Sequence, residues 1–557
     1  MSIDRRKMRW NGWGWIDHPD PSAAVPDLWS RIAVELGMPA LLATPARPLG
    51  AIDAPAPRLG DADLAVFKDI VGEVNLRTDA QERASHARGK SYHDLLILRS
   101  GRLPELPDAV LYPSAADEVL RILGAAEDMN IAVVPFGGGS SVVGGVTARS
   151  GPAHAGVLAI DTTRMTRLLG LDHVAKTARI EPGLYGPQLE EKLNAEGVTL
   201  GHYPQSFEFS TLGGWIAARG AGQQSNRYGK AEKWLVSANL ATPRGLWTSE
   251  DFPASAAGPR LGDLIPGSEG TLGIITEATV RVKSLPEVRD YRAALFLDFL
   301  SGLEAVRAIA QNDIPVAMLR LSDADETWFF QAFSTSPSKP TLARRLTAAY
   351  LKLRGFAGRP CVLLYGLEGD RPATAYSRGR IASIIRGAGG LLAGTSPGKR
   401  WYHGRFASPY LRDPMMDHGL GVDTLETATR WSNVEPLYRA VRHALLSSMA
   451  EQAPVRGAKG IVLAHVSHSY PDGASLYFTY VFPRDLAREI EQWHAIKTAA
   501  SDAIARHGGT ISHHHGVGED HSPWLPDEKG PIAMMALRAL KRELDPKGIL
   551  NPGKLLA

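Results

Sequence analysis

The side chains of this chain that could transfer protons are three successive histidines, His513, His514 and His515, and a strand tyrosine, Tyr477. Imidazole changes its charge near neutral pH, so a histidine can accept or donate a proton there. A phenol has an ordinary pKa of about 10, so Tyr477 needs a cationic or hydrogen-bonding neighbour to act as a base. Two plainer interpretations stay open from these residues alone: Tyr477 as an ordinary aromatic strand residue, and the histidines as a polar surface loop.

The same histidines could bind a metal ion. On an extended chain adjacent side chains point to opposite faces, so we expect that at most His513 and His515 could share a ligand sphere. The single cysteine, Cys361, is distant in sequence, and Glu519 and Asp520 lie beyond a glycine turn. We therefore expect no metal site.

Two arginines could bind an anion. The forked guanidinium of Arg412 suits a phosphate, because its donors reach two oxygens at once. The plainer interpretation is a surface ion pair with Asp413 or Asp417. Arg320 interrupts the apolar run 318–321, and a charge in such a strand needs a partner or a ligand.

Three segments rich in small residues, 135–142, 204–215 and 266–276, could surround a phosphate-bearing cofactor. Consecutive glycines let backbone amides approach an anion, and nearby hydroxyls add donors. The first segment does not match the dinucleotide-binding fingerprint, because Val142 stands where the third glycine belongs. That disfavours a nicotinamide site of the Rossmann type. A plain turn between strands stays open for the first segment alone, but three such loops feeding apolar strands favour one large cofactor.

The elements that must position these residues have a mixed pattern. We predict strands over 131–136, 157–161, 177–181 and 476–482, a helix over 186–196 that ends at Gly197, and further helices over 298–312, 342–353, 435–452 and 485–507. Strands and helices intermix without a clean βαβαβ repeat, which predicts an α+β fold.

Length and composition exclude several classes of protein. The chain has 557 residues, 44% hydrophobic and 22% charged, which is ordinary for a globular protein and suggests three to four domains. A net charge of +3 with no block of like charge excludes a nucleic-acid binder. The single cysteine favours a reducing compartment, and we find neither a secretory signal nor a run of 18 apolar residues. We expect a cytoplasmic protein.

Seven motifs together resemble one family of flavoproteins. PFGGGSSV (135–142), GHYPQSFEFSTLGGW (201–215) and GSEGTLGIITEAT (267–279) resemble the FAD-binding domain of the vanillyl-alcohol-oxidase (PCMH) type. The chain further resembles the alkyldihydroxyacetonephosphate synthase family in KMRWNGW (7–13), ATPRG (241–245), YLRD (410–413) and SHHHGVG (512–518). Of these, RWNGWG, YLRD and SHHHGVG are the motifs most specific to that family.

The resemblance implies an α+β architecture. It consists of a lead-in (1–105), a two-subdomain FAD-binding domain (106–286), a substrate-binding cap with an antiparallel sheet and flanking helices (287–510), and a C-terminal segment returning to the FAD site (511–557). FAD is implied to bind without a covalent link. The implied cofactor-binding residues are Pro135, Phe136, Gly137, Gly138, Gly139, Ser140, Ser141, Val142, Gln205, Ser206, Ser210, Thr211, Ala218, Arg219, Gly220, Ala221, Glu269, Gly270, Thr271, Gly273, Ile274 and Ile275.

The implied reaction replaces the acyl chain of acyl-dihydroxyacetone phosphate by a fatty alcohol, with no net redox change of the flavin. The resemblance assigns catalysis to Tyr477, Arg320 and the three histidines. It assigns substrate binding to Arg412, Thr424 and His202. A homodimer and a peripheral membrane contact are also expected.

Two positions depart from the family pattern. His465 stands where an arginine is usual, which removes a fixed charge near the expected site, and Thr424 stands where a serine is common. The alternative function is an FAD-dependent dehydrogenase or oxidase of 2-hydroxy acids, such as D-lactate or glycolate, on the same architecture.

Overall fold

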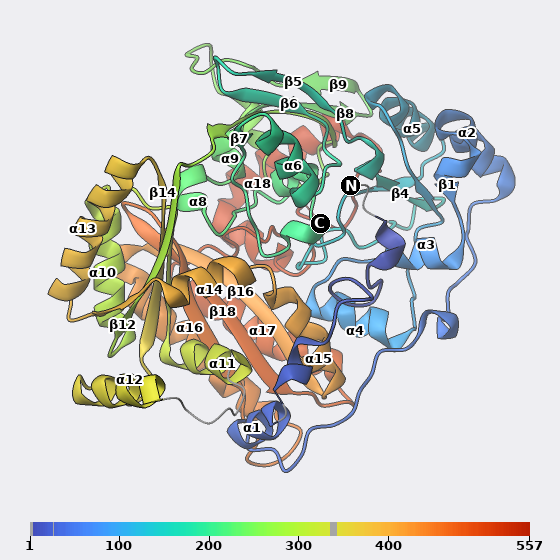
Figure 1. Ribbon diagram of the computed structural model, residues 1–557. Coiled ribbons are helices and arrows are strands. Elements are labelled where there is room, and N and C mark those ends of the chain that lie inside the picture. Colours follow the sequence, from blue (N-terminus) through green and yellow to red (C-terminus); the bar gives the residue numbers. More distant parts are fainter. Residues whose placement is uncertain (1–3, 26, 335–341, 557) are drawn as a thin grey trace.

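A computed structural model describes residues 4–25, 27–334 and 342–556 of the chain. Within these residues the strands form sheets of four, five, two and seven strands. The two larger cofactor-side sheets occupy one half of the molecule, and the seven-stranded sheet with its helices occupies the other half (Figure 1). The α+β class predicted from the sequence is confirmed.

The four-stranded sheet carries the first glycine-rich segment. Its order is β1 (Leu76–Arg77), β2 (Ala109–Leu111), β4 (Val157–Asp161) and β3 (Ala132–Phe136). Strands β2, β4 and β3 are parallel and fully or nearly fully buried, as their short runs of Val, Ile, Leu and Ala predict. Helices α2 (Asp61–Val71) and α5 (Ala116–Asp128) pack on the sheet through their apolar faces. The first segment leaves the carboxyl end of β3.

The five-stranded antiparallel sheet carries the other two segments. Its order is β5 (Leu168–Asp172), β6 (Thr177–Ile180), β10 (Ile274–Arg281), β8 (Leu235–Thr242) and β9 (Gly245–Thr248). The second segment leads into α7 (Leu212–Ala217), and the third leads into β10. Helices α6 (Gly186–Ala195), α7 and α9 (Ala231–Trp234) share a core with this sheet. Strands β7 (Val198–Thr199) and β11 (Lys283–Ser284) form the small two-stranded sheet.

The seven-stranded sheet is antiparallel throughout. Its order is β15 (Leu391–Gly394), β12 (Val288–Phe296), β14 (Cys361–Gly369), β13 (Met318–Ser322), β17 (Ile461–Ser469), β18 (Gly473–Pro483) and β16 (Leu420–Arg430). Helices α10 (Phe299–Gln311), α16 (Trp431–Glu451) and α17 (Glu489–Arg506) share one apolar core with this sheet. In the central register, Tyr477 of β18 lies opposite His465 of β17 on one side and Glu426 of β16 on the other.

The two ends of the chain join the cofactor half. Arg5 donates hydrogen bonds to the carbonyl of Gly137 and, at 2.6 Å, to the carboxylate of Asp161. After α18 (Leu525–Leu544), the chain returns to β3, where the amide of Val133 donates to the carbonyl of Ile549 at 2.7 Å. Both terminal segments therefore hold the first glycine-rich segment in place.

Most predicted elements are present with shifted ends. The helix predicted over 435–452 starts earlier, at Trp431, and contains Pro436 in its second turn. Helix α18 was not predicted. Gly530 interrupts it with a positive φ of 76°, which breaks the continuous helical pattern. No helix of the described residues is both long and apolar enough to cross a bilayer. The four domain boundaries remain a prediction.

Candidate active site

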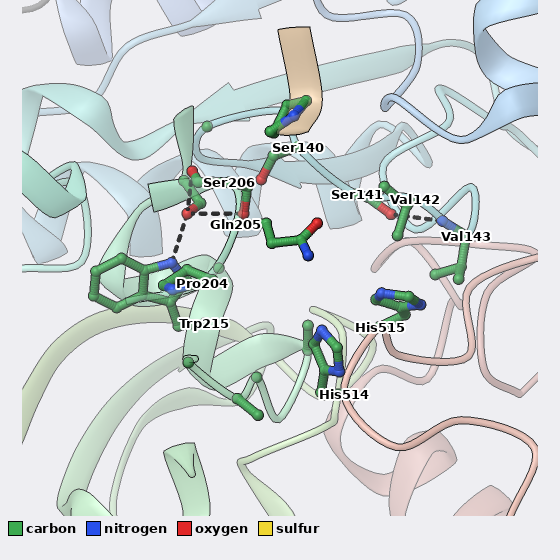
Figure 2. A pocket seen from close by; sticks show the side chains of 18 of the residues that line it. Ser140, Ser141, Val142, Val143, Pro204, Gln205, Ser206, Trp215, His514 and His515 are labelled. Carbon is green, nitrogen blue, oxygen red and sulfur yellow. Dashed lines mark hydrogen bonds between the residues drawn. The ribbon is translucent and has the colours of Figure 1, made fainter. Parts of the chain in front are cut away.

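A cavity of about 340 Å³ lies between the cofactor half and the seven-stranded sheet. This volume is within the range of about 300–1,000 Å³ that is usual for ligand sites. One side, here called the glycine wall, consists of segments 135–142, 204–215 and 266–276. The other side, here called the sheet wall, consists of the cavity-facing side chains of β13, β16, β17 and β18. Figure 2 shows His514 and His515 across the cavity from Ser140 and Ser206.

The glycines of the first segment are required by its contact with the second. A Cβ on Gly138 would lie 1.9 Å from the carbonyl oxygen of Phe209, and one on Gly137 would lie 2.3 Å from Oγ1 of Thr211. Gly139 has a φ of 69°, which an ordinary side chain rarely adopts. The two segments can touch only because these residues are glycine. The three-loop cradle predicted from the sequence is thus a packed unit rather than separate turns.

The second segment is held by its own hydroxyl groups. The indole of Trp215 donates to Oγ of Ser210 at 2.7 Å, and Ser210 donates in turn to the carbonyl of Ser206 at 2.8 Å. These bonds, visible in Figure 2, fix the loop before α7 with Gln205 facing the cavity. The hydroxyl of Thr211 is buried and has no hydrogen-bond partner among the described residues, so it is a donor available to a cofactor.

Glu269 connects the third segment to the histidine loop. Its carboxylate accepts the backbone amides of Val517 and Gly518, the latter at 2.7 Å. Burial nevertheless raises the pKa of the Glu269 carboxyl to about 7. Glu269 also has a φ of 51°, an unusual conformation held by the amide of Asn551, which donates to the Glu269 carbonyl at 2.6 Å. The side chain therefore joins the glycine wall to the histidine loop.

The structure brings most of the predicted cofactor-binding residues to the cavity. Two lie outside its lining: Arg219 is half exposed and 3.7 Å from Glu232, and Thr271 is buried with its hydroxyl on the carbonyl of Ser268. The predicted residues that do line the cavity are Pro135, Phe136, Gly137, Gly138, Gly139, Ser140, Ser141, Val142, Gln205, Ser206, Ser210, Thr211, Ala218, Gly220, Ala221, Glu269, Gly270, Gly273, Ile274 and Ile275.

His202 presents a hydrogen-bond donor to the cavity. Burial, helped by the neighbouring imidazoles of His514 and His468, lowers the pKa of His202 to about 3, so its ring is neutral. The indole of Trp234 donates to Nδ1 at 3.3 Å, and an indole N–H can only donate. Nε2 therefore carries the proton, and it has no partner among the described residues. This orphaned donor, the free Thr211 hydroxyl and the glycine wall fit a bound flavin nucleotide.

The sheet wall follows the alternation of four neighbouring strands. Residues two apart on a strand share a face, and the cavity-facing members are Met318 and Arg320 on β13, Leu463, His465 and Ser467 on β17, Tyr477 and Thr479 on β18, and Val422 and Thr424 on β16. His468 also lines the cavity, at the register shift of β17 between Val466 and Ser469. The predicted shared face of residues 477 and 479 is therefore observed. The pairing of β13 with β17 joins residues up to 145 apart in sequence, Leu321 and Val466, and puts these side chains together.

Tyr477 lies at the centre of the sheet wall among possible proton partners. The ring of His465 stacks on it with centroids 4.9 Å apart, and the ring of His515 meets it edge-on at 5.5 Å. Burial, together with the Glu426 carboxylate, raises the pKa of the Tyr477 phenol to about 12, against the lowering effects of Thr424, Arg412 and Arg320. The phenol is therefore protonated at neutral pH, and a bound ligand or a proton acceptor must assist any role as a base.

Arg320 and His465 share one carboxylate. Arg320 lies 3.1 Å from Oε1 of Glu326, and His465 donates to the same oxygen at 2.8 Å. Burial opposes ionisation of Glu326, but His465 and Arg320 outweigh it and lower the pKa of the carboxyl to about 2. Burial, with Arg320 nearby, lowers the pKa of His465. The charge of Arg320 is thus balanced by Glu326, a residue of α11 (Ala324–Ser334) that the sequence analysis missed.

Arg412 has a charge that no carboxylate neutralises directly. Asp413 accepts the amide of Trp13 and lies 3.3 Å from Arg9, and Asp417 pairs with Arg99. Among the described residues no acid lies within ion-pair distance of Arg412, whose guanidinium donates to the carbonyl of Lys90 at 3.1 Å. The surface ion pair considered for Arg412 is therefore absent from the described part of the chain.

The histidine loop meets a buried acid, Glu426. Nδ1 of His513 lies 3.2 Å from Oε1 of Glu426, and Nδ1 of His514 lies against Oε2. The expectation that only His513 and His515 could share a ligand sphere is wrong, because the loop bends at each histidine instead of running extended. His513 lies behind the cavity lining, whereas His514 and His515 reach it.

Glu426 is the main site residue that the sequence analysis missed. It lies in β16, within the run LGVDTLETATR, and its side chain is fully buried. The sequence holds one signal for this residue: an acid within a run of strand-forming residues. A charge buried in a strand requires partners. Its partners come from β17 and the C-terminal loop, which local sequence does not indicate.

The far end of the cavity is apolar. Phe329 and Phe330 of α11, Met415 of α15 (Arg412–Asp417), and Leu411 line it together with the strand residues Val422 and Leu463. The cavity therefore combines a polar centre at Tyr477 with a hydrocarbon-like end.

Two models of protein families match this chain. A family model described as "FAD binding domain" matches residues 107–249, and one described as "FAD linked oxidases, C-terminal domain" matches residues 285–555. The chain is a flavoprotein of the FAD-linked oxidase type. P-cresol methylhydroxylase shares this fold with a TM-score of 0.67 at 14% identity.

Several individual proteins resemble this chain over nearly its full length. Alkyldihydroxyacetonephosphate synthase of Dictyostelium discoideum is 33% identical over 99% of this chain and 94% of that protein. The synthase of Caenorhabditis elegans is 31% identical over 99% of this chain and 95% of its own length. A solved structure titled alkyldihydroxyacetonephosphate synthase has a TM-score of 0.83 at 31% identity and covers 99% of both chains. The chain belongs to the alkyldihydroxyacetonephosphate synthase family, which confirms the resemblance seen in the motifs.

Proposed function

We propose that this protein is an FAD-dependent alkyldihydroxyacetonephosphate synthase. It exchanges the acyl chain of acyl-dihydroxyacetone phosphate for a fatty alcohol and releases a fatty acid, with no net redox change. The observation that carries this proposal is the meeting of Tyr477, the unpaired Arg412 and the histidine loop at the centre of one cavity whose far end is apolar. Similarity to the synthases along the full chain supports it.

The glycine wall would hold FAD without a covalent link. Segment 135–142 would receive the pyrophosphate, because its glycines expose backbone amides and Ser140 and Ser141 add hydroxyl donors. The N–H at Nε2 of His202 and the Thr211 hydroxyl would donate to polar atoms of the cofactor. When bound, the flavin supplies an electrophilic ring nitrogen for the dihydroxyacetone carbon chain.

Arg412 would bind the phosphate of the substrate. Its guanidinium is free of carboxylates, whereas the charge of Arg320 is balanced by Glu326. A fixed cation beside Tyr477 also favours ionisation of the phenol, and Arg412 already acts in that direction. Arg320 would keep Glu326 and His465 in place beneath the tyrosine ring.

Tyr477 would remove a proton from the carbon next to the substrate ketone. Thr424 and Arg412 favour its ionised form, and the stacked ring of His465 holds the phenol in one orientation. His515, edge-on to the phenol, and His514 lie where they can assist departure of the carboxylate. The apolar end at Phe329, Met415 and Val422 would then accept the departing and entering alkyl chains in turn.

A product assay tests this function. Purified holoprotein, with no added electron acceptor, is incubated with acyl-dihydroxyacetone phosphate and hexadecanol, and the lipids are analysed by mass spectrometry. We expect an ether product together with free fatty acid. Bleaching of the flavin by D-lactate or glycolate, with no ether product, would contradict the proposal. That outcome would place this chain with relatives such as the glycolate oxidase subunit GlcD of Bacillus subtilis, which is 26% identical.

A further inference from the structure

Glu426 is a buried anion at the back of the sheet wall. Its side chain is inaccessible to solvent, and its position on β16 lies directly opposite Tyr477 of β18. Burial opposes the charge, but His514 and His513 outweigh it and keep the pKa of the Glu426 carboxyl well below its ordinary value. A buried charge is retained only when its surroundings compensate it, so these neighbours are essential to its state.

The neighbours of Glu426 are imidazoles and a hydroxyl. Ser467 donates its hydroxyl to Oε1, and Nδ1 of His468 lies 3.5 Å from the same oxygen. Nδ1 of His513 lies 3.2 Å from Oε1, and Nδ1 of His514 lies against Oε2. One carboxylate therefore meets side chains from β17 and from the C-terminal loop.

Hydrogen-bond roles fix how these rings are protonated. Nε2 of His468 faces the carbonyl of Gly222 at 2.9 Å, so it carries a proton. Nδ1 is left to accept from Ser475, because the hydroxyl of Ser467 already donates to Glu426. Nδ1 of His513 and Nδ1 of His514 are buried within ion-pair distance of the Glu426 oxygens, and neither has another hydrogen-bond partner among the described residues. We therefore assign a proton to Nδ1 of both rings, because an unprotonated nitrogen would be repelled by the carboxylate. Tyr470 then donates to Nε2 of His513 at 2.6 Å.

His514 differs from His513 in what its second nitrogen meets. Nε2 of His513 is used by Tyr470, and burial lowers the pKa of His513 to about 3. His514 lines the cavity, and its ring lies nearly parallel to that of Tyr477 with centroids 6.4 Å apart. With Nδ1 turned to Glu426, Nε2 is the nitrogen of His514 that is free to accept a proton on the cavity side.

We propose that Glu426 is a positioning residue for the reaction, which acts through His514. It holds His514 with Nδ1 protonated and Nε2 free, and it balances the positive charge that forms when Nε2 takes up a proton. The phenol of Tyr477 gives its proton to Nε2 of His514 and takes the proton of the substrate carbon in its place. His514 then passes its proton to the departing carboxylate, which leaves as the fatty acid. This role rests on the proposed function, and it supplies the proton acceptor that the weakly acidic phenol requires.

A metal ion is the competing use of the same side chains. Glu426 with His468 and His513, or with His514 and His515, presents donor atoms that lie within 4.8 Å of one another. A metal held through Nδ1 of His514 needs that nitrogen without a proton, whereas a hydrogen bond to Glu426 needs it protonated. The protonation state of Nδ1 therefore separates the two uses.

A double-mutant cycle tests the pair on the holoprotein. We expect Glu426→Gln to lower kcat by roughly 10²–10³-fold with FAD still bound, as for loss of an acid–base partner. In a His514→Ala background, Glu426→Gln should change kcat less than about threefold, because residues that act as a unit are not additive. Glu426→Asp keeps the charge and should restore part of the rate. Full additivity of the two changes would overturn the proposal.

Asp423→Asn is the matched control. Asp423 is also buried on β16, but it faces the other side of the sheet, where it accepts from Tyr480 and Trp493 and lies 3.5 Å from Lys497. We expect it to lower thermal stability and to combine additively with His514→Ala. A cycle as strongly non-additive as that of Glu426 would show that any buried charge on this strand has the same effect.

Histidine nitrogen NMR on the ¹⁵N-histidine holoprotein without substrate tests the pair even if no ether product forms. We expect the Nδ1-protonated tautomer for His514 in the native protein and its loss in Glu426→Gln. An Nε2-protonated His514 in the native protein would overturn the proposal, and so would a stoichiometric metal ion that Glu426→Gln releases. A correct tautomer without ether synthesis would instead refute the proposed function alone.

Discussion

The glycine wall and the sheet wall of this cavity are built on different principles. The glycine wall is determined by backbone approach: a Cβ on Gly138 would lie 1.9 Å from the carbonyl oxygen of Phe209. The sheet wall is determined by side chains that project from four strands, with Tyr477, His465 and Glu426 in one line across them. A substitution in the glycine wall should therefore weaken FAD binding. A substitution in the sheet wall should lower the reaction rate and leave FAD bound.

Tyr477→Phe, in the sheet wall, should have the largest effect on the reaction rate. We expect turnover to fall by at least about 10³-fold, because the variant lacks the group that receives the substrate proton. The visible flavin absorbance should be unchanged, since Tyr477 belongs to no loop of the glycine wall. Steady-state rates and the ratio of flavin to protein absorbance measure the two effects. Near-native rates would remove Tyr477 from the mechanism.

Gly138→Ala should disrupt the packing between the first two segments of the glycine wall. The added methyl group must displace the second segment, which should lower the free energy of unfolding by about 1–3 kcal/mol and release FAD. Gly124→Ala on α5 is the matched control, because a Cβ there meets no atom within 4 Å. Thermal unfolding and flavin content are compared for both. Full flavin content in Gly138→Ala would show that the packing of the two segments does not shape the cofactor site.

Arg412→Ala separates substrate binding from cofactor binding. We expect KM for acyl-dihydroxyacetone phosphate to rise roughly 10–100-fold, as for loss of a hydrogen-bonded charge worth about 1.5–3 kcal/mol. Flavin content and the response to hexadecanol concentration should stay unchanged. The control is Arg439→Ala, which removes an exposed ion pair with Glu435 on α16. An unchanged KM would assign the phosphate to another residue.

Glu269 joins the third segment to the histidine loop, and its titration should affect stability alone. Its pKa is about 7 in the folded protein against an ordinary 4.5, so between these values the folded state holds the proton more firmly than the unfolded state. Stability therefore falls as the pH rises from 4.5 to 7, by about 2–3 kcal/mol. Unfolding temperatures of Glu269→Gln, measured across this range, should fall less than those of the native protein. Parallel curves would contradict this.

The two walls also differ in how well the sequence predicts them. Most residues expected to bind the cofactor line the cavity, because consecutive glycines and hydroxyls are local signals. Arg219 and Thr271 are the exceptions: both lie in the right segments, but their side chains turn away from the cavity. Local pattern identifies a loop more reliably than the direction of each side chain in it.

The sheet wall was predicted only in part. Alternation correctly grouped residues 477 and 479, but Glu326 and Glu426 reach the site through pairings of distant strands and a helix. The bends at His513 and His514 could not be inferred from three identical residues. These contacts depend on tertiary structure, so a single sequence does not contain a local signal for them.

The absorption spectrum of the purified holoprotein tests the central claim most directly. It is recorded without oxygen, before and after acyl-dihydroxyacetone phosphate is added, and again after hexadecanol. If the glycine wall holds FAD against the Tyr477 face, the flavin bands should change with the first addition and return with the second. A preparation without flavin that cannot be reconstituted, or bands that substrate leaves unchanged while D-lactate bleaches them, would contradict the account.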